Sequence, residues 1–376
     1  MKKLIIYFFM IVLIFQPACL EDSFTPNEPP LDDTDCNKLL AYVNAQGYFR
    51  KLLGKPNLVT PDIVASNLDN YYIIDLRSHE EFISGRISGA VNVYKDSLIT
   101  YLENLNNVDT KTILFVCRDG QLSSYVQCLV GLYGFNNIST LKYGMASWNI
   151  NFASEWINNI RTFSSSNSEY PLNNHLIYLE ERYTLPAVVL PQGENITAKV
   201  NESIKQLLAA PANISSDIMD EQTVFCHFRS IFQHFDYQTE VFEDMDFICY
   251  GTKALYAIYS SKYPELPSHP KNTWWMEIPL QYDYRLSNSV HLLANDKPIV
   301  FYSTDGHDSA FAVALLRLLG YNAKSVLYGI NSFQYNAMIS EWNFDSLVFS
   351  PMDEIKEDAF IPGKYGNYPY ISGIPD

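Results

Sequence analysis

The sequence predicts an α/β protein built from two doubly wound parallel-sheet domains in tandem. One observation is an internal repeat, in which two matching segments recur in the same order in both halves of the chain. The other is that short apolar runs of strand length alternate with segments of helical spacing, which favours parallel sheets covered by helices. The 376 residues suffice for two or three domains, and a hydrophobic content of 47% excludes a globally disordered chain.

Two pairs of matching segments define the repeat. Leu52–Val64 aligns with Leu207–Met219, and Ile113–Gly120 aligns with Ile299–Gly306. The interval between the two segments is longer in the second copy, so we expect an insertion there. Chance similarity of short apolar runs is the alternative, but an Asp-Gly pair closes the second segment in both copies.

Each element of the first copy has a local signal. Tyr71–Asp75 and Thr112–Val116 are short apolar runs that predict buried parallel strands. Ser123–Phe135 has apolar residues at helical spacing and a glycine near its end, which predicts a helix. Ile138–Leu141 predicts a further strand. Ligand sites in such sheets lie beyond the carboxyl ends of the strands, which is where Cys117 falls.

Cys117 begins a loop, Cys-Arg-Asp-Gly-Gln-Leu-Ser, between a predicted strand and a predicted helix. Successive main-chain N–H groups and the start of the helix would both stabilise an anion there. Arg118 adds a positive charge, and Gly120 permits a tight backbone. We therefore expect Cys117 to be a nucleophile with a depressed pKa, rather than a buried structural cysteine.

At these residues the chain resembles the rhodanese family. Cys117–Gly120 resembles the active-site loop of that family, and Asp75–Asn92 resembles its signature D-x-R…E-[FY]-x-x-G-H-I-x-G-A-x-N, with Arg86 in place of the usual His. The resemblance covers about residues 40 to 160. A weaker similarity over roughly residues 205 to 350 implies two rhodanese-like domains in tandem.

The resemblance implies sulfur transfer. Cys117 would take a sulfane sulfur from a donor such as thiosulfate and pass it, as a persulfide, to cyanide or another thiol. No metal or organic cofactor is implied. Asp75 and Arg77 are expected to brace the loop as an ion pair rather than to react. The residues implied to bind the substrate are Arg118, Asp119, Gly120, Gln121, Leu122 and Ser123.

Two positions of the loop depart from related proteins. Leu122 stands where many active members have Thr, Ser or Arg, so we expect weak activity toward thiosulfate or a different donor. Cysteine phosphatases of the related fold need an arginine six places after the cysteine, and Ser123 at that place disfavours phosphatase chemistry. A non-catalytic binding or scaffold protein therefore stays as the alternative function.

The second copy is predicted to be inactive in sulfur transfer. Ser303 stands at the position of Cys117, and Phe247–Gly251 lacks the Asp-x-Arg pair of the first copy. A hydrolytic Ser303–His307 pair is disfavoured, because the sequence indicates no third residue that would orient the histidine.

The N-terminus has the pattern of an export signal. Met1–Lys3 is positively charged, and the apolar run Leu4–Phe15 is too short to span a bilayer. The following Gln-Pro-Ala-Cys resembles a bacterial lipoprotein cleavage box with Gln16 at an aliphatic position. We expect residues 1–19 to be a lipoprotein-type signal peptide, with Cys19 lipidated in the cell envelope. Cleavage after Ala18 with release to the periplasm or the medium is the alternative.

Composition limits the remaining functions. The net charge of −16 disfavours nucleic acid as a partner, and membrane contact is expected through the lipid anchor only. The sequence has no CxxC or HExxH motif, so no metal site is predicted. Whether Cys36, Cys226 and Cys249 form disulfide bridges, and the oligomeric state, stay open.

The predicted domain boundaries follow from these features. They are a signal peptide at 1–19, a tether at 20–35, a rhodanese domain at 36–165, a connector at 166–202, a degenerate rhodanese-like domain at 203–350 and a tail at 351–376.

Replacing Cys19 with serine tests the predicted anchor. We expect metabolic labelling with a fatty acid to mark the wild-type chain and not the Cys19→Ser variant, because only the thiol of Cys19 would accept the lipid. Equal labelling of the two chains would contradict lipidation at this residue.

Overall fold

The structure is a computed structural model of the whole chain. It describes residues 34–105, 110–162, 172–173, 177–178, 183–215, 219–236, 238–239, 241–242, 244–251, 269–270, 272–277, 289–339 and 358–375. All of these residues belong to one compact unit, Asp33–Asp376. The predicted signal peptide and Cys19 lie outside the described residues. In the described part of the chain, no helix is both long enough and apolar enough to cross a membrane.

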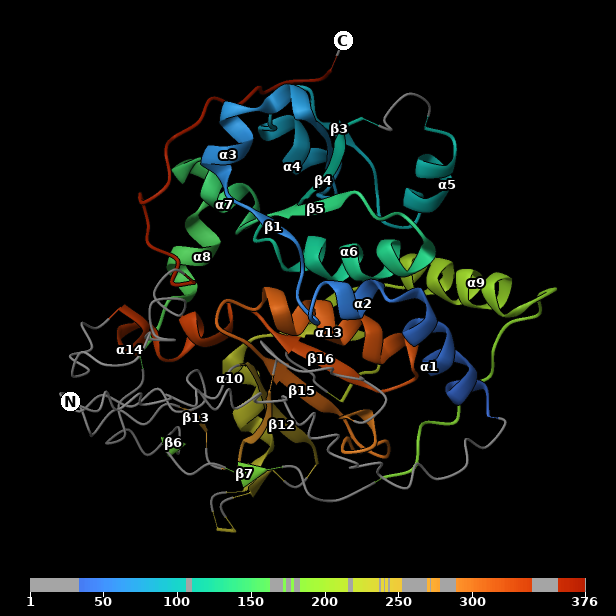
Figure 1. Cartoon of the computed structure of the whole chain (residues 1–376). Coiled ribbons are helices and arrows are strands. Elements are labelled where there is room, and N and C mark those ends of the chain that lie inside the picture. Colours follow the sequence, from blue (N-terminus) through green and yellow to red (C-terminus); the bar gives the residue numbers. More distant parts are fainter. Residues whose placement is uncertain are drawn as a thin grey trace, which may run out of the picture. The chain divides into compact units, whose positions relative to one another are not determined.

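The first half contains a parallel sheet of five strands (Figure 1). Its strands are β1 (Leu58–Val59), β2 (Tyr71–Asp75), β3 (Val91–Asn92), β4 (Thr112–Val116) and β5 (Ile138–Leu141). Their order in the sheet is β1-β5-β4-β2-β3, and every pairing is parallel. The three strands predicted from apolar runs, β2, β4 and β5, have the predicted bounds. The predicted helix is α6, which begins two residues earlier and covers Gln121–Tyr133.

Helices cover both faces of this sheet. On one face, Ile74 and Phe115 belong to a core shared with α6 and the N-terminal helices. On the other face, Ile73 and Leu114 pack in a separate core with Val64 of α3. The helices of this half are α1 (Asp35–Gln46), α2 (Tyr48–Lys51), α3 (Pro61–Ser66), η1 (Leu68–Asn70), α4 (His79–Ser84), α5 (Leu98–Glu103), α6, α7 (Gly144–Trp148), η2 (Ile150–Phe152) and α8 (Ser154–Asn159). The first half is therefore a doubly wound α/β domain.

The second half contains a parallel sheet of seven strands. Its strands are β7 (Ile177–Tyr178), β8 (Asn213–Ser215), β9 (Thr223–Cys226), β12 (Asp246–Gly251), β14 (Trp274–Glu277), β15 (Ile299–Tyr302) and β16 (Ala323–Val326). Their order is β7-β14-β12-β15-β16-β9-β8, and all pairings are parallel. Five adjacent strands, β9-β16-β15-β12-β14, have the same order as the first sheet. The predicted architecture of α/β units with parallel sheets therefore agrees with the structure.

The remaining described elements are short or lie between the sheets. Two antiparallel ribbons are β10 (Phe235–Asp236) with β11 (Val241–Phe242), and β6 (Leu172–Asn173) with β13 (His269–Pro270). The helices are α9 (Ile196–Ala209), α10 (Phe228–Ile231), η3 (Phe232–His234), α13 (His307–Leu318), η4 (Gly329–Ser332) and α14 (Tyr335–Ile339). Helix α9 runs across the predicted boundary at residues 202 and 203, and it packs against α1, α6 and α13.

The strand order corrects one of the two repeat alignments. The sequence alignment equates β1 with Asn213 and Ile214 of β8, but β8 lies at the edge of its sheet. The strand in the position of β1 is β9, because the main-chain oxygen of Cys226 accepts from Leu327 just as that of Val59 accepts from Lys142. Two neighbouring short strands have similar composition, so local sequence cannot show which of them joins the sheet interior. The other alignment corresponds to β4 and β15, which occupy equivalent central positions.

Helices α6 and α13 pack against each other between the two sheets (Figure 1). Leu129 of α6 and Leu315 of α13 are fully buried in one hydrophobic core that extends across both halves. Phe49 of α2 stacks on Phe311 of α13 with ring centroids 5.5 Å apart. Because the core is continuous, the two halves bury their surfaces against each other rather than against solvent.

The C-terminal strap, which we define as residues 358–375, runs back from the second half along the first. Trp148 donates its indole N–H to the oxygen of Pro369, at 2.9 Å. Arg86 and Ile371 exchange two main-chain hydrogen bonds, and the Arg86 guanidinium donates to the oxygen of Gly373 at 2.6 Å. Arg86, which departs from the resembled signature, therefore helps to hold the strap in place.

Asp75 and Arg77 form a buried ion pair at the end of β2. The distance between Arg77 Nη2 and Asp75 Oδ2 is 2.7 Å, and the two side chains are 4% and 1% exposed. The same guanidinium nitrogen donates to the oxygen of Gly85 at 2.6 Å. Asn92 donates to the main-chain oxygens of both Asp75 and Arg77, so the pair connects β2, β3 and the loop after α4.

Removing the buried carboxylate of Asp75 tests whether the ion pair with Arg77 stabilises the fold. We expect Asp75→Ala to lower the free energy of unfolding by about 3–5 kcal/mol, because it leaves the guanidinium of Arg77 buried without its anion. Lys205→Ala is the matched control, since it removes an exposed pair with Glu103 at 3.6 Å. The control should change the free energy of unfolding by less than about 1 kcal/mol. Urea denaturation measures both, and equal effects of the two substitutions would refute the structural role of the pair.

Candidate functional site

Cys117 lies at the carboxyl end of β4, where the chain turns into α6. Gly120 is the residue before the helix, and its φ of 90° lies in the left-handed region that favours glycine. A side chain at this position would also collide with the imidazole of His307. The glycine of the loop therefore allows both the turn of the backbone and the close approach of the second half.

Main-chain N–H groups surround the sulfur of Cys117. Gly120 N lies 3.1 Å from Cys117 Sγ, and Ser123 N lies 3.4 Å from it. The hydroxyl of Ser123 is a further neighbour at 3.3 Å. On the other side, the thiol donates to Asp119 Oδ1 at 3.6 Å. Gly120 and Ser123 thus provide the cradle that the sequence predicts, while Asp119 adds a negative charge beside the sulfur.

The predicted depressed pKa of Cys117 is not what the structure supports. The residue is only 2% exposed. Burial, and to a smaller extent the Asp119 carboxylate, raise the pKa of Cys117 to about 12, although hydrogen bonds from Ser123 oppose both effects. The sequence revealed the donors but not the burial. In this arrangement Cys117 is a neutral thiol.

Arg118 is paired rather than free to attract an anionic donor. Its Nε and Nη2 atoms both lie 2.9 Å from Oε1 of Glu81, which belongs to α4. Burial opposes ionisation of Glu81, but Arg118 and Ser78 outweigh burial and hold the pKa of Glu81 below its ordinary value. The Arg118 side chain is 42% exposed, so it lies at the surface with its charge largely compensated.

The side chain of Gln121 reaches the second half of the chain. Its Nε2 donates to the main-chain oxygens of Gly306 and Val326, at 3.2 and 3.1 Å. Its Oε1 accepts from the N–H of Tyr328 at 2.7 Å. Leu122, the next residue, is half-buried against the hydrophobic core. Gln121 therefore connects the two halves, a role that sequence could not indicate because its partners are far along the chain.

The corresponding loop of the second half has the same geometry around an oxygen. Gly306 N and Ser309 N each lie 3.2 Å from Ser303 Oγ. His307 Nδ1 lies 2.9 Å from Asp305 Oδ1, but that carboxylate oxygen accepts from the main-chain N–H of His307, and no hydrogen bond joins it to the imidazole. His307 Nε2 accepts from the N–H of Tyr143 at 3.1 Å and is not directed at Ser303. The arrangement therefore provides no Ser–His pair for hydrolysis.

Aromatic side chains enclose the region where the two loops meet. Trp156 of α8 lies edge-on to Tyr328, with ring centroids 4.7 Å apart, and stacks on Phe360 of the strap at 4.9 Å. Tyr143 lies edge-on to both Trp156 and Phe360, at 5.3 Å. These residues come from both halves and from the strap, and no sequence motif joins them. They contribute to the exclusion of water from the loops.

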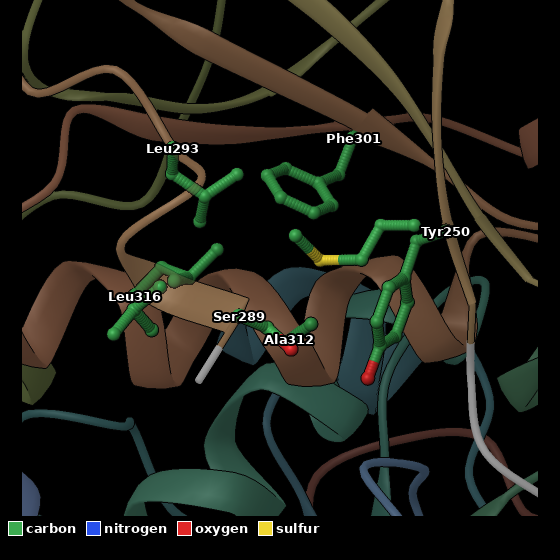
Figure 2. A pocket seen from close by; sticks show the side chains of 8 residues that line it. Tyr250, Ser289, Leu293, Phe301, Ala312 and Leu316 are labelled. Carbon is green, nitrogen blue, oxygen red and sulfur yellow. The ribbon is translucent and has the colours of Figure 1, made fainter. Parts of the chain in front are cut away.

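A separate small pocket lies in the second half beside α13 (Figure 2). Its lining is mainly apolar, and the hydroxyls of Tyr250 and Ser289 are its polar groups. The lining residues are Tyr250, Met276, Ser289, Val290, Leu293, Phe301, Ala312 and Leu316. It contains no thiol, imidazole or charged side chain, so the chemistry that Cys117 offers is not available there.

Thiols in the described part of the chain are all unpaired and buried. They are Cys36, Cys117, Cys128, Cys226 and Cys249. Among the described residues, no group of three His, Cys, Asp or Glu side chains is placed to hold a metal ion.

A family model for the rhodanese-like domain matches residues 60–151. The chain contains a rhodanese-like domain. This match includes β2, β4, β5, the cysteine loop and α6, and it does not extend into the second half. No curated protein matches the chain.

Several solved rhodanese structures are similar to part of the chain. A rhodanese-related protein from Thermoplasma volcanium is 24% identical over 24% of this chain and 89% of its own, with a TM-score of 0.23. A rhodanese-like domain protein from Staphylococcus aureus is 24% identical over 25% of this chain and 91% of its own, with a TM-score of 0.23. The reduced CoADR-RHD protein of Bacillus anthracis is 25% identical over 24% of this chain and 16% of its own, with a TM-score of 0.22.

Asp119→Asn tests the electrostatic control of the thiol. Removing the carboxylate should lower the pKa of Cys117 and accelerate its alkylation at pH 8 severalfold, because only the thiolate reacts. Ser123→Ala should slow alkylation, since it removes a donor to the sulfur.

For the wild-type chain, a pKa of about 12 means that the thiolate fraction grows with pH through 9 and 10. An ordinary cysteine, with a pKa of about 8.5, is largely ionised by then. Mass spectrometry of the Cys117 peptide gives the rates. Slower alkylation of Asp119→Asn than of the wild type would contradict this account.

Proposed function

We propose that the chain is a sulfurtransferase in which Cys117 carries a sulfane sulfur as a persulfide. The observation that carries this proposal is the pair of main-chain N–H groups, from Gly120 and Ser123, that approach the sulfur at 3.1 and 3.4 Å. These donors would stabilise negative charge on a thiolate or on the outer sulfur of a persulfide. Their position in a rhodanese-like domain supports the same chemistry.

The reaction would proceed in two displacement steps. The thiol of Cys117 first loses its proton, for which Asp119 Oδ1 at 3.6 Å is the adjacent acceptor. The thiolate then attacks the outer sulfur of a donor such as thiosulfate, so that a sulfur–sulfur bond forms and sulfite leaves with the electron pair of the broken bond. In the second step, cyanide or an acceptor thiol attacks the outer sulfur, and Cys117 leaves as the thiolate.

We propose that the second half is a degenerate copy of the same domain. The shared order of five strands and the equivalent placement of α6 and α13 support this proposal. Ser303 accepts from Gly306 and Ser309 as Cys117 accepts from Gly120 and Ser123. Because a serine hydroxyl does not carry sulfane sulfur, this copy would have no transfer activity of its own.

We also propose that the protein works outside the cytoplasm. The charged and apolar N-terminal pattern and Cys19 support export followed by lipid anchoring in a cell envelope. The partners would be a small sulfur donor and a thiol or cyanide acceptor.

A non-catalytic binding protein is the second candidate. The 2% exposure of Cys117 favours it, as does the pairing of Arg118 with Glu81. In that case both halves would present surfaces to a partner, and the loop would keep its shape for structural reasons.

Mass spectrometry of the purified chain distinguishes the two candidates. Sulfur transfer predicts that incubation with thiosulfate adds one sulfur, about 32 Da, to the Cys117 peptide. The chain should also produce thiocyanate from thiosulfate and cyanide. Cys117→Ser should abolish both signals, and Ser303→Ala should leave both unchanged because the second loop carries no sulfur. Equal thiocyanate production by the wild type and Cys117→Ser, or no mass gain with any sulfane donor, would favour the binding protein.

A further inference from the structure

The two loops lock into each other through side chains in equivalent positions. Gln121 is the first residue of α6, and its Oε1 accepts from the main-chain N–H of Tyr328 at 2.7 Å. His307 is the first residue of α13, and its Nε2 accepts from the main-chain N–H of Tyr143 at 3.1 Å. Each half therefore supplies the acceptor for a buried N–H group of the other half. We call these two hydrogen bonds, Gln121 with Tyr328 and His307 with Tyr143, the lock.

The N–H group that His307 binds belongs to the turn that holds the Cys117 loop. Tyr143 has a φ of 60° and precedes Gly144 at the start of α7. The next two amides of this turn, from Met145 and Ala146, donate to the main-chain oxygens of Cys117 and Arg118 at 2.9 and 3.1 Å. A change at His307 would reach the Cys117 loop through two hydrogen-bonded steps and through its packing against Gly120, without any hydrogen bond to the sulfur.

Packing around the lock is close. His307 has no exposed surface, and its ring lies 5.4 Å from the ring of Tyr143, edge-on. A Cβ atom at Gly120 would collide with the imidazole, and one at Gly144 would collide with the oxygen of Cys117. Loss of the acceptor would leave a buried N–H group of Tyr143 without its partner from His307, which destabilises the closed arrangement.

We propose that His307 of the second half is a positioning residue for the Cys117 loop. This inference rests on the proposed function of Cys117, but the contact itself does not. The imidazole holds the Tyr143 turn, which holds the loop and keeps the thiol enclosed. When the lock opens, the loop is released and the sulfur becomes accessible. His307 therefore has a role although the Ser303 loop that it belongs to carries no sulfur.

The test compares His307→Gln and His307→Ala with the wild type in the full chain. Glutamine is the matched replacement, because Gln121 already performs the equivalent task with an amide oxygen. The readout is the rate at which dipyridyl disulfide, which reacts with thiols even in mild acid, modifies Cys117, followed by mass spectrometry of its peptide. At pH 8, His307→Ala should react roughly tenfold faster than the wild type, whereas His307→Gln should match it.

Comparison of the two variants separates positioning from packing. Both substitutions remove the imidazole ring, but only His307→Gln keeps a side-chain acceptor for the N–H of Tyr143. Recovery of the wild-type rate by glutamine therefore identifies the hydrogen bond as the cause. Gln121→Ala serves as the reciprocal variant and should also accelerate modification of Cys117.

Two results would overturn the proposal. One is a folded His307→Ala variant that reacts no faster than the wild type, and the other is a His307→Gln variant that reacts as fast as His307→Ala. If His307→Ala does not fold, Gln121→Ala takes its place and must react faster than the wild type. None of these rates requires a sulfur donor, so a chain that transfers no sulfur can still confirm or refute the lock.

Discussion

Buried main-chain N–H groups at the junction of the two halves each need an acceptor, and this requirement organises the structure. Tyr143 and Tyr328 both present such groups, in turns that also bind the Cys117 and Ser303 loops through the following amides. In both turns the side-chain acceptor comes from the opposite half. The halves are thus coupled at the point where each strand-to-helix loop is formed, and a displacement of one loop cannot leave the other unaffected.

The same junction explains why the sulfur is both well surrounded and unreactive. The amides of Gly120 and Ser123 provide a cradle for a negative charge, but enclosure by the second half makes the charge costly to create. Asp119 adds to that cost. A loop shaped for an anion therefore holds a neutral thiol as long as the halves stay closed. Protection of a persulfide from water and from stray thiols would follow from the same enclosure.

Local signals in the sequence were sufficient for the strands and for the cysteine loop, but not for contacts between distant segments. Strands β2, β4 and β5 have the predicted bounds because their apolar runs are short and their ends are marked by polar residues. The roles of Gln121 and Arg86 could not be predicted, since their partners lie at least 185 residues away. The pairing of β9 rather than β8 with β16 depends on the whole sheet. Burial of Cys117 was missed for the same reason, because the segments that cover it have no local relation to the loop.

The C-terminal strap has a consequence for the order in which the protein is made. Trp148 receives its partner, the oxygen of Pro369, only after 221 further residues have been added. Ile371 and Gly373, the partners of Arg86, are synthesised later still. During synthesis the first half can form its sheet on the ribosome, but its outer helices stay incompletely packed until the strap emerges. A pause in translation before residue 358 would therefore leave the first half without the C-terminal strap. Its outer helices would be accessible to proteases and chaperones until the strap is synthesised.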